Sequence, residues 1–247
     1  MKNSNELQRQ AFEAIAQCLP TPLNPGAVTV EDGLSYTISP IKAHDYATGL
    51  FAAFGAAVEQ LGRMRGLPEQ SVTVNRRLSG LVLNSLQLTF VNGRTLTIDD
   101  YSTSADNGTY RTRDGRFVTL IGLHPKLREG IFGHFGTVTA AGMQHAIGQR
   151  DGQELEDTLA TLRLPLGLVR SPEEWLAHRQ GAATAAHPMI LFEQHAGGGS
   201  RKLAPAKARP LEGVRVVELA NVVAGPTCAR ALAEQGAEVI KIAPPTG

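Results

Sequence analysis

Residues 211–242 read LEGVRVVELANVVAGPTCARALAEQGAEVIKI, and this stretch decides the fold. Two apolar-rich runs, 214–219 and 237–242, flank a run of helix-forming residues at 227–236. A strand, a short helix and a second strand at this spacing predict a parallel pair joined by a right-handed crossover. Strands this apolar are normally buried on both faces of a sheet. We therefore expect an α/β fold in which residues 211–247 are the incomplete start of a Rossmann-like domain, so that the chain is a partial one.

The chain ahead of this segment divides by composition. Residues 196–210, AGGGSRKLAPAKARP, are rich in Gly, Pro and Lys and predict a linker between domains. We expect a helical segment over 1–91 and a small α+β domain over 92–195.

Periodicity and turn signals give the expected elements of the segment over 1–91. They are helices over 5–18, 46–64 and 76–89, a strand over 71–75, and a hairpin at Asp32-Gly33 between 28–30 and 34–38.

The same signals apply to the small domain. They predict a loop over 92–109, a hairpin across Asp114-Gly115, and helices over 126–135, 151–163 and 171–181.

Composition excludes several classes of protein. Apolar residues make up 42% of the chain and the formal net charge is +1, so neither nucleic acid nor an anionic membrane is expected as a partner. Cys18 and Cys228 lie too far apart in sequence to suggest a disulfide framework, and the histidines lack the spacing of a metal site. We find no signal peptide and no run long enough to span a membrane, and we expect a cytoplasmic protein.

Residues 211–242 resemble the N-terminal signature of the family III CoA-transferases, which include formyl-CoA and carnitine CoA-transferases and the α-methylacyl-CoA racemases. The first strand, the AGP turn at 224–226 and the closing GAEVIKI agree with it in order and spacing. Read without the family, the turn is a plain strand-to-helix connection with Pro at the first helical position. The resemblance implies a turn that contacts CoA, formed by Asn221, Val222, Val223, Ala224, Gly225 and Pro226.

The stretch HDYATG at 44–49 stands before a helix of small residues and resembles the family's active-site segment. That resemblance implies that Asp45 is the catalytic carboxylate. From the residues alone, an Asp directly before a helical run is an N-cap, and we interpret His44 as a surface residue. Most family members place the strand–helix–strand signature before the catalytic Asp, whereas here it follows. This order suits a permuted member or the junction of two fused halves.

The resemblance implies a CoA-transferase whose substrates are an acyl-CoA and a carboxylic acid, with no tightly bound cofactor and no metal. In that reaction the Asp45 carboxylate attacks the thioester, forms a mixed anhydride and releases CoA. Family members form interlocked homodimers, which a complete protein would share. The alternatives are an acyl-CoA racemase or isomerase of the same fold, and a non-catalytic assembly or binding module.

Overall fold

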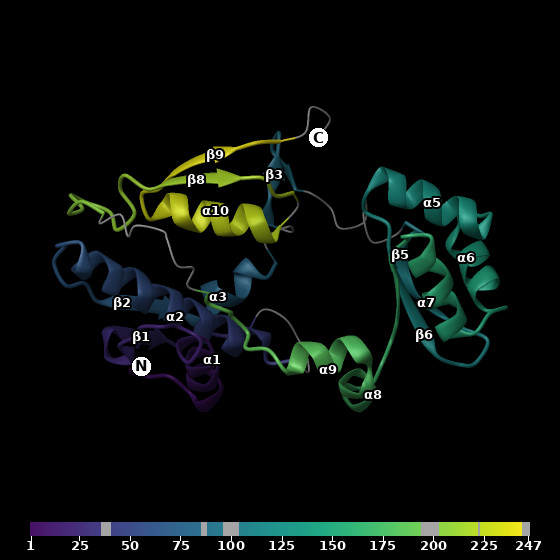
Figure 1. Cartoon of the computed structure of the whole chain (residues 1–247), viewed down its shortest axis with the longest axis horizontal. Helices are drawn as coiled ribbons and strands as arrows, with labels where there is room; N and C mark the ends of the chain where they lie inside the picture. Colours follow the sequence, from purple (N-terminus) through teal and green to yellow (C-terminus); the bar gives the residue numbers. More distant parts are fainter. Residues whose placement is uncertain (36–40, 85–87, 96–103, 194–202, 222, 244–247) are drawn as a thin grey trace. The chain divides into compact units, whose positions relative to one another are not determined.

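The computed structural model describes residues 1–35, 41–84, 88–95, 104–193, 203–221 and 223–243 (Figure 1). The chain is a mixed α/β protein that divides into two compact units, one of residues 1–83 and 188–247 and the other of residues 84–187. Each unit has its own cluster of buried apolar residues. In the described part of the chain, no helix has the length and apolar character needed to cross a membrane.

Helices and short strands alternate in the N-terminal part of the first unit. They are α1 (Glu6–Ala16), the 3-10 helix η1 (Pro25–Ala27), β1 (Val28–Glu31), α2 (Ala43–Met64), β2 (Val72–Asn75) and α3 (Arg76–Val82). β1 pairs with β2 in parallel, with Val28 opposite Val72. The strand that pairs with β1 thus comes from beyond α2, and residues 34 and 35 are not in a strand. Residues 36–38, the rest of the second strand of the hairpin expected at Asp32-Gly33, lie outside the described residues.

α1 packs closely on α2 because α2 presents almost no side-chain bulk to it. A Cβ atom at Gly49 would lie 2.4 Å from the carbonyl oxygen of Gln8 and 2.6 Å from the Cβ of Ala11. Further along, small residues of α2 fill the core beside the two strands. This core consists of Phe12, Val28, Ala52, Ala53, Ala56 and Val74. The helix predicted over 46–64 is confirmed, and its small residues serve this close approach.

The C-terminal part of the first unit is the predicted strand–helix–strand unit. β8 (Arg215–Glu218) and β9 (Glu238–Lys241) pair in parallel, with α10 (Ala224–Glu234) between them in sequence. Gly236 ends the crossover with φ at 101°, which favours glycine. Val217 and Ile240 are 59% and 49% exposed, so in the described part of the chain these strands are not buried on both faces.

Residues 203–212 are held against the end of α2 by one buried side chain, Arg65. Its guanidinium donates to the carbonyl oxygens of Ala204 at 2.6 Å, Pro210 at 2.6 Å and Glu212 at 2.9 Å. The backbone N–H of Ala206 donates to the carbonyl oxygen of Arg65 at 2.9 Å. The described part of the stretch expected to be a linker, residues 203–210, is thus fixed by four hydrogen bonds to a single residue, and Glu212 beyond it accepts a fifth.

The second unit is a three-stranded antiparallel sheet with helices. Its elements are β3 (Phe90–Val91), β4 (Arg94–Thr95), β5 (Asn107–Arg111), β6 (Phe117–Ile121), α5 (Pro125–Phe135), α6 (Ala140–Ile147), α7 (Gly152–Thr161), β7 (Leu166–Leu168), α8 (Pro172–Ala177) and α9 (Arg179–Ala185). The sheet order is β5-β6-β7, and β3 pairs separately with β4. The hairpin across Asp114-Gly115 and the helices over 126–135 and 151–163 are confirmed.

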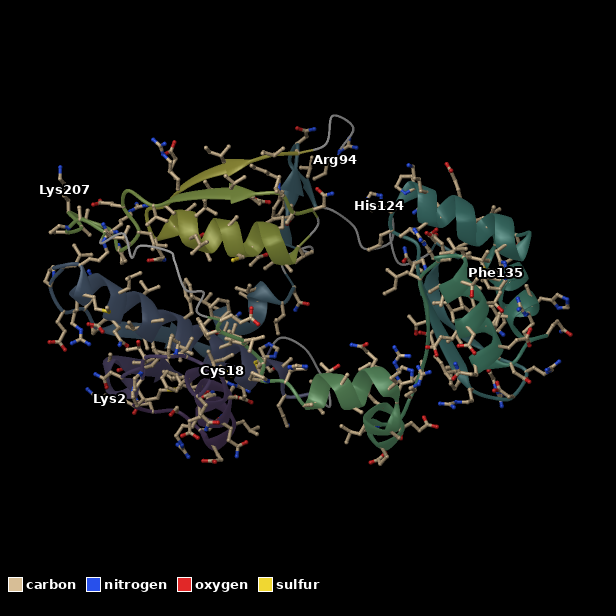
Figure 2. The ribbon with its side chains drawn as sticks, in the orientation of Figure 1. Lys2, Cys18, Arg94, His124, Phe135 and Lys207 are labelled. Carbon is tan, nitrogen blue, oxygen red and sulfur yellow. The ribbon has the colours of Figure 1, made fainter. Side chains whose placement is uncertain are left out.

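Apolar side chains from the sheet and from α5, α6 and α7 form the core of the second unit. Its fully buried members include Val118, Leu120, Ile131, Met143, Ile147, Leu155 and Leu159. Phe135, at the end of α5, packs against this cluster (Figure 2).

Two expectations for the second unit are wrong. The stretch expected as a loop over 92–109 holds a two-stranded hairpin, because Asn92 and Gly93 have φ of 52° and 76°, as a tight hairpin turn requires. The helix expected over 171–181 is interrupted at His178, which ends α8 and caps α9. Gly181 lies within α9, where a Cβ atom would be 1.8 Å from the carbonyl oxygen of Trp175.

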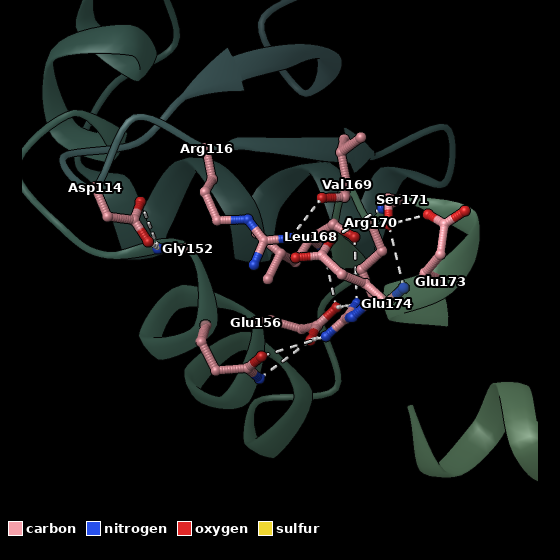
Figure 3. Close-up of polar contacts among 11 residues, drawn as sticks. Asp114, Arg116, Gly152, Glu156, Leu168, Val169, Arg170, Ser171, Glu173 and Glu174 are labelled. Atoms are coloured by element: carbon pink, nitrogen blue, oxygen red, sulfur yellow. Dashed lines mark hydrogen bonds and ion pairs between the residues drawn. The ribbon is translucent and has the colours of Figure 1, made fainter. Parts of the chain in front are cut away.

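A group of ion pairs joins α7, β7 and α8 (Figure 3). Glu156 of α7 binds the Arg170 guanidinium, with Nη1 to Oε1 at 2.8 Å, and accepts the backbone N–H of Leu168 at 2.9 Å. Arg116 donates to Glu174 at 2.7 Å and to the carbonyl oxygen of Val169 at 3.0 Å. The helices are therefore fixed to the sheet edge by charge as well as by apolar packing.

Candidate functional site

Asp45 is the third residue of α2 and is only 5% exposed. The N-cap of α2 is Lys42, which makes no side-chain capping bond. The interpretation of Asp45 as an N-cap is therefore wrong, because its carboxylate is directed at other side chains and not at the first backbone N–H groups of its own helix.

The Asp45 carboxylate is bound by side chains from α3 and from the start of α1. Oδ1 accepts from Asn5 Nδ2 at 3.0 Å, Gln8 Nε2 at 3.0 Å and Arg76 Nε at 2.7 Å. Oδ2 accepts from Arg76 Nη2 at 3.2 Å. The two oxygens are thus unequal, since Oδ1 has three donors and Oδ2 has one.

These contacts keep Asp45 ionised. The hydrogen bond from Arg76 lowers the pKa of the carboxyl below its usual value, and the bonds from Asn5 and Gln8 and the charge of Arg76 add to this. Burial acts in the opposite direction but is outweighed. Asp45 also raises the pKa of Arg76, so each partner stabilises the charge of the other.

Asn5 and Gln8 are aligned by the way in which α1 begins. Asn5 is the N-cap of α1, and its side-chain oxygen accepts the N–H of Gln8 at 3.0 Å. The side-chain oxygen of Gln8 accepts the N–H of Asn5 in return, also at 3.0 Å, which completes a capping box. With both amide oxygens used in this way, both NH₂ groups are directed at Asp45.

Arg76 is aligned by the start of α3. It is the first residue of α3, whose N-cap Asn75 accepts the N–H of Leu78 at 3.1 Å. Its Nη1 donates to the carbonyl oxygen of Gly33 at 2.6 Å, which fixes the far side of the guanidinium. The planar fork is then free to meet Asp45 through Nε and Nη2.

His44 is buried and not a surface residue as expected, since only 4% of it is exposed. Ser35 Oγ lies 3.0 Å from its Nδ1. The ring fits against α3 because residue 80 is glycine: a Cβ atom there would lie 1.8 Å from His44 Cδ2. His44 and Asp45 are both buried, and the His44 ring lies against Ser35 whereas the Asp45 carboxylate binds Arg76.

The turn at 221–226 opens α10. Val223 is half-exposed and stands at the N-cap position without a side-chain capping bond, and α10 begins at Ala224. A Cβ atom at Gly225 would lie 2.0 Å from that of Ala220, so the turn requires glycine there. Pro226 is the third helical residue and not the first. Val222 lies outside the described residues.

Comparison with known proteins identifies this C-terminal segment. The model of CoA-transferase family III matches residues 211–247. Residues 211–247 are thus similar to CoA-transferase family III. The chain is 34% identical over 106 residues to an acyl-CoA transferase of Gibberella moniliformis, covering 40% of this chain and 18% of that protein.

Two further relatives carry CoA-transferase names. The chain is 28% identical over 159 residues to the acetyl-coenzyme A transferase nodX of Hypoxylon pulicicidum, covering 55% of this chain and 26% of that protein. It is 60% identical over 37 residues to a succinyl-CoA–D-citramalate CoA-transferase of Chloroflexus aurantiacus, covering 15% of this chain and 9% of that protein. The chain spans about a quarter or less of the length of these relatives.

The family III segment also holds an ion pair that the sequence analysis missed. Lys241, at the end of β9, binds the Glu218 carboxylate and donates to the carbonyl oxygen of Ala220 at 3.2 Å. Glu218 is 9% exposed and ends β8. This pair fixes the chain immediately before the 221–226 turn.

The structure brings Asp45 together with Asn5, Gln8 and Arg76, none of which was predicted as a site residue. The capping-box spacing of Asn5 and Gln8 was a visible signal, but it did not indicate what their NH₂ groups bind. Among the described residues, no hydrogen bond or ion pair joins Asp45 to the 221–226 turn. No group of three His, Cys, Asp or Glu side chains in the described ranges is placed to hold a metal ion.

Proposed function

We propose that the chain is part of a CoA-transferase that moves CoA between an acyl-CoA thioester and a carboxylic acid, with Asp45 as the acyl carrier. The observation that carries the proposal is the Asp45 carboxylate, buried at the head of α2 and kept ionised by Arg76, Asn5 and Gln8. The family III match of residues 211–247 supports it.

The chemistry suits an ionised carboxylate. Attack of Asp45 on the thioester carbonyl forms a mixed anhydride and releases CoA as its thiolate, which is a good leaving group. The thiolate then attacks the Asp45 carbonyl carbon of this anhydride, which forms an Asp45–CoA thioester and releases the first acid as its carboxylate. The acceptor carboxylate attacks that thioester to form a second anhydride with Asp45, and the thiolate attacks the acceptor's carbonyl carbon to give the new acyl-CoA and free Asp45. Since Asp45 is already ionised, no partnering base is needed. In the same proposal, the 221–226 turn contacts CoA. Assembly of the complete protein as a homodimer remains a prediction.

The surroundings of Asp45 favour transfer over racemisation. A racemase must take up and return a proton next to the thioester, which requires acid–base groups that titrate near neutral pH. The side chains bonded to Asp45 are two amides and an arginine, and an arginine stays protonated. A carboxylate whose pKa is lowered is also a weak base.

The burial of Asp45 also favours a second candidate from another class. The Asp45 carboxylate is 5% exposed and joins α1, α2 and α3, and its pair with Arg76 has the features of a purely structural ion pair. The chain would then be a non-catalytic module that binds or assembles with a partner.

Acylation of the purified chain separates the two candidates. The chain is incubated with a panel of acyl-CoA thioesters and then with hydroxylamine, and peptides are analysed by mass spectrometry. We expect a hydroxamate on the peptide that contains Asp45, and its loss in Asp45→Asn.

Glu13→Gln is the matched control, because it removes an exposed carboxylate of α1 and should label like the wild type. Thermal melting shows whether each variant is folded. Absence of any hydroxamate, together with absence of CoA binding by calorimetry, would establish the non-catalytic module instead.

A further inference from the structure

The Asp45 carboxylate is held asymmetrically, and the asymmetry assigns different roles to its oxygens. An ionised carboxylate oxygen offers about two lone-pair sites to donors. Oδ1 already receives three donors, at 3.0, 3.0 and 2.7 Å. Oδ2 receives only Arg76 Nη2, at 3.2 Å, which is at the long end of the range for such bonds.

We infer that Asn5, Gln8 and Arg76 are the positioning residues of the transferase, which hold Asp45 by Oδ1 and leave Oδ2 to attack the thioester carbonyl. This inference rests on the proposed function and adds three residues and one atom to it. None of the three reacts with the substrate; each acts through Asp45.

The step balances with the groups present. A lone pair of Oδ2 forms the bond to the thioester carbonyl carbon, and the carbon–sulfur bond breaks with its electron pair leaving on the CoA thiolate. Asp45 is then joined to the acyl group through Oδ2, and Oδ1 becomes the remaining carbonyl oxygen. As a carbonyl oxygen, Oδ1 still accepts from Asn5 and Gln8. These two hydrogen bonds are therefore kept while the Asp45 carboxylate loses its negative charge.

Arg76 is the partner that gives way during attack. Its side chain is 20% exposed, compared with 6% for Asp45, and Gln8 is 2% exposed. The weak Nη2 bond to Oδ2 breaks as Oδ2 bonds to carbon, while Nε remains near Oδ1. Asp32 is the other charged group that acts on Arg76, and it favours the charged guanidinium.

The capping box allows the hydrogen bonds to Asp45 to be altered without unfolding α1. Serine is as good an N-cap as asparagine, so Asn5→Ser keeps the acceptor for the N–H of Gln8 but removes the donor to Oδ1. Arg76→Gln removes the charge and the fork, and Arg76→Lys restores the charge alone. Arg77→Gln makes the same charge change at the next position and is the matched control.

The test is the single-turnover rate of hydroxamate formation at Asp45 with an acyl-CoA that labels the wild type, measured across pH. We expect Arg76→Gln to slow acylation on the order of 10-fold or more. The midpoint of the fall in acylation rate at acidic pH should also move to higher pH, because the carboxylate loses its cation. Arg76→Lys should recover part of the rate, Asn5→Ser should shift the midpoint in the same direction, and Arg77→Gln should match the wild type.

The outcomes distinguish this inference from the function on which it rests. If the wild type is acylated at Asp45 but Arg76→Gln and Asn5→Ser keep its rate and midpoint, the positioning role is overturned and the transferase stands. If the wild type is acylated at another residue or not at all, both are overturned. Melting curves confirm that rates are compared between folded proteins.

Discussion

At the scale of single residues, Gly49 lies at a close approach between α1 and α2. We expect Gly49→Ala to lower the free energy of unfolding by about 1–3 kcal/mol, because the added Cβ would meet backbone and side-chain atoms of α1 at 2.4 and 2.6 Å. The better helix propensity of alanine, about 1 kcal/mol, offsets only part of this cost. Urea denaturation followed by circular dichroism measures the change.

Gly133 in α5 offers the opposite case, since a Cβ atom there meets nothing within 4 Å. Gly133→Ala should therefore gain stability by about 0.5–1 kcal/mol through helix propensity alone. If both substitutions changed stability in the same direction, close approach at Gly49 would not be the cause.

At the scale of elements, the Glu156–Arg170 pair makes the attachment of α7 to β7 sensitive to acid. The Arg170 guanidinium lowers the pKa of Glu156 from 4.5 to about 2. Because this pKa is lower in the folded chain, the pair contributes stability above pH 4.5 and loses it as the pH falls towards 2. We expect Glu156→Gln to be less stable than the wild type at pH 7 and to lose less stability on acidification. Thermal melting across this pH range measures both effects.

Glu154→Gln removes the same charge two residues earlier, where the exposed Glu154 pairs with Arg150, which stands just before α7 begins. It should alter neither the stability at pH 7 nor its pH dependence by much, since exposed pairs contribute little. Equal pH profiles for the two variants would show that α7 is not held to β7 by this charge.

The elements that sequence reasoning found are those with local signals. The β8–α10–β9 unit and the β5–β6 hairpin are predicted by patterns of a few residues, namely apolar runs and the Asp114-Gly115 turn. The parallel pairing of β1 with β2 has no local signal, because α2 lies between the strands. The side chains that bind Asp45 were missed for the same reason, because Asn5, Gln8 and Arg76 lie 40, 37 and 31 residues away from it in the chain. The resemblance of residues 44–49 to the family's active-site segment thus indicated the candidate carboxylate, but no local pattern indicated the side chains that hold it.

At the scale of the whole molecule, the first unit is built from two separate stretches of chain, and Arg65 joins them. Residues 1–83 supply Arg65, and residues 188–247 supply the carbonyl oxygens of Ala204, Pro210 and Glu212 that its guanidinium binds. A lysine has one ammonium group in place of this planar fork and cannot satisfy all three oxygens with the same geometry. We expect Arg65→Lys to cost about 1–3 kcal/mol, in line with hydrogen bonds to charged groups.

The effect should concentrate where the two stretches meet. In Arg65→Lys, the N–H of Ala206, which donates to the carbonyl oxygen of Arg65, should exchange with deuterium faster than in the wild type. Amides of β5 and β6, in the second unit, should exchange as before. Arg9→Lys, a like change at an exposed pair with Glu6, is the control and should leave both regions unchanged. Unchanged exchange at Ala206 in Arg65→Lys would mean that the C-terminal stretch is held by its apolar contacts. The signature segment of family III would then keep its place on α2 without the guanidinium.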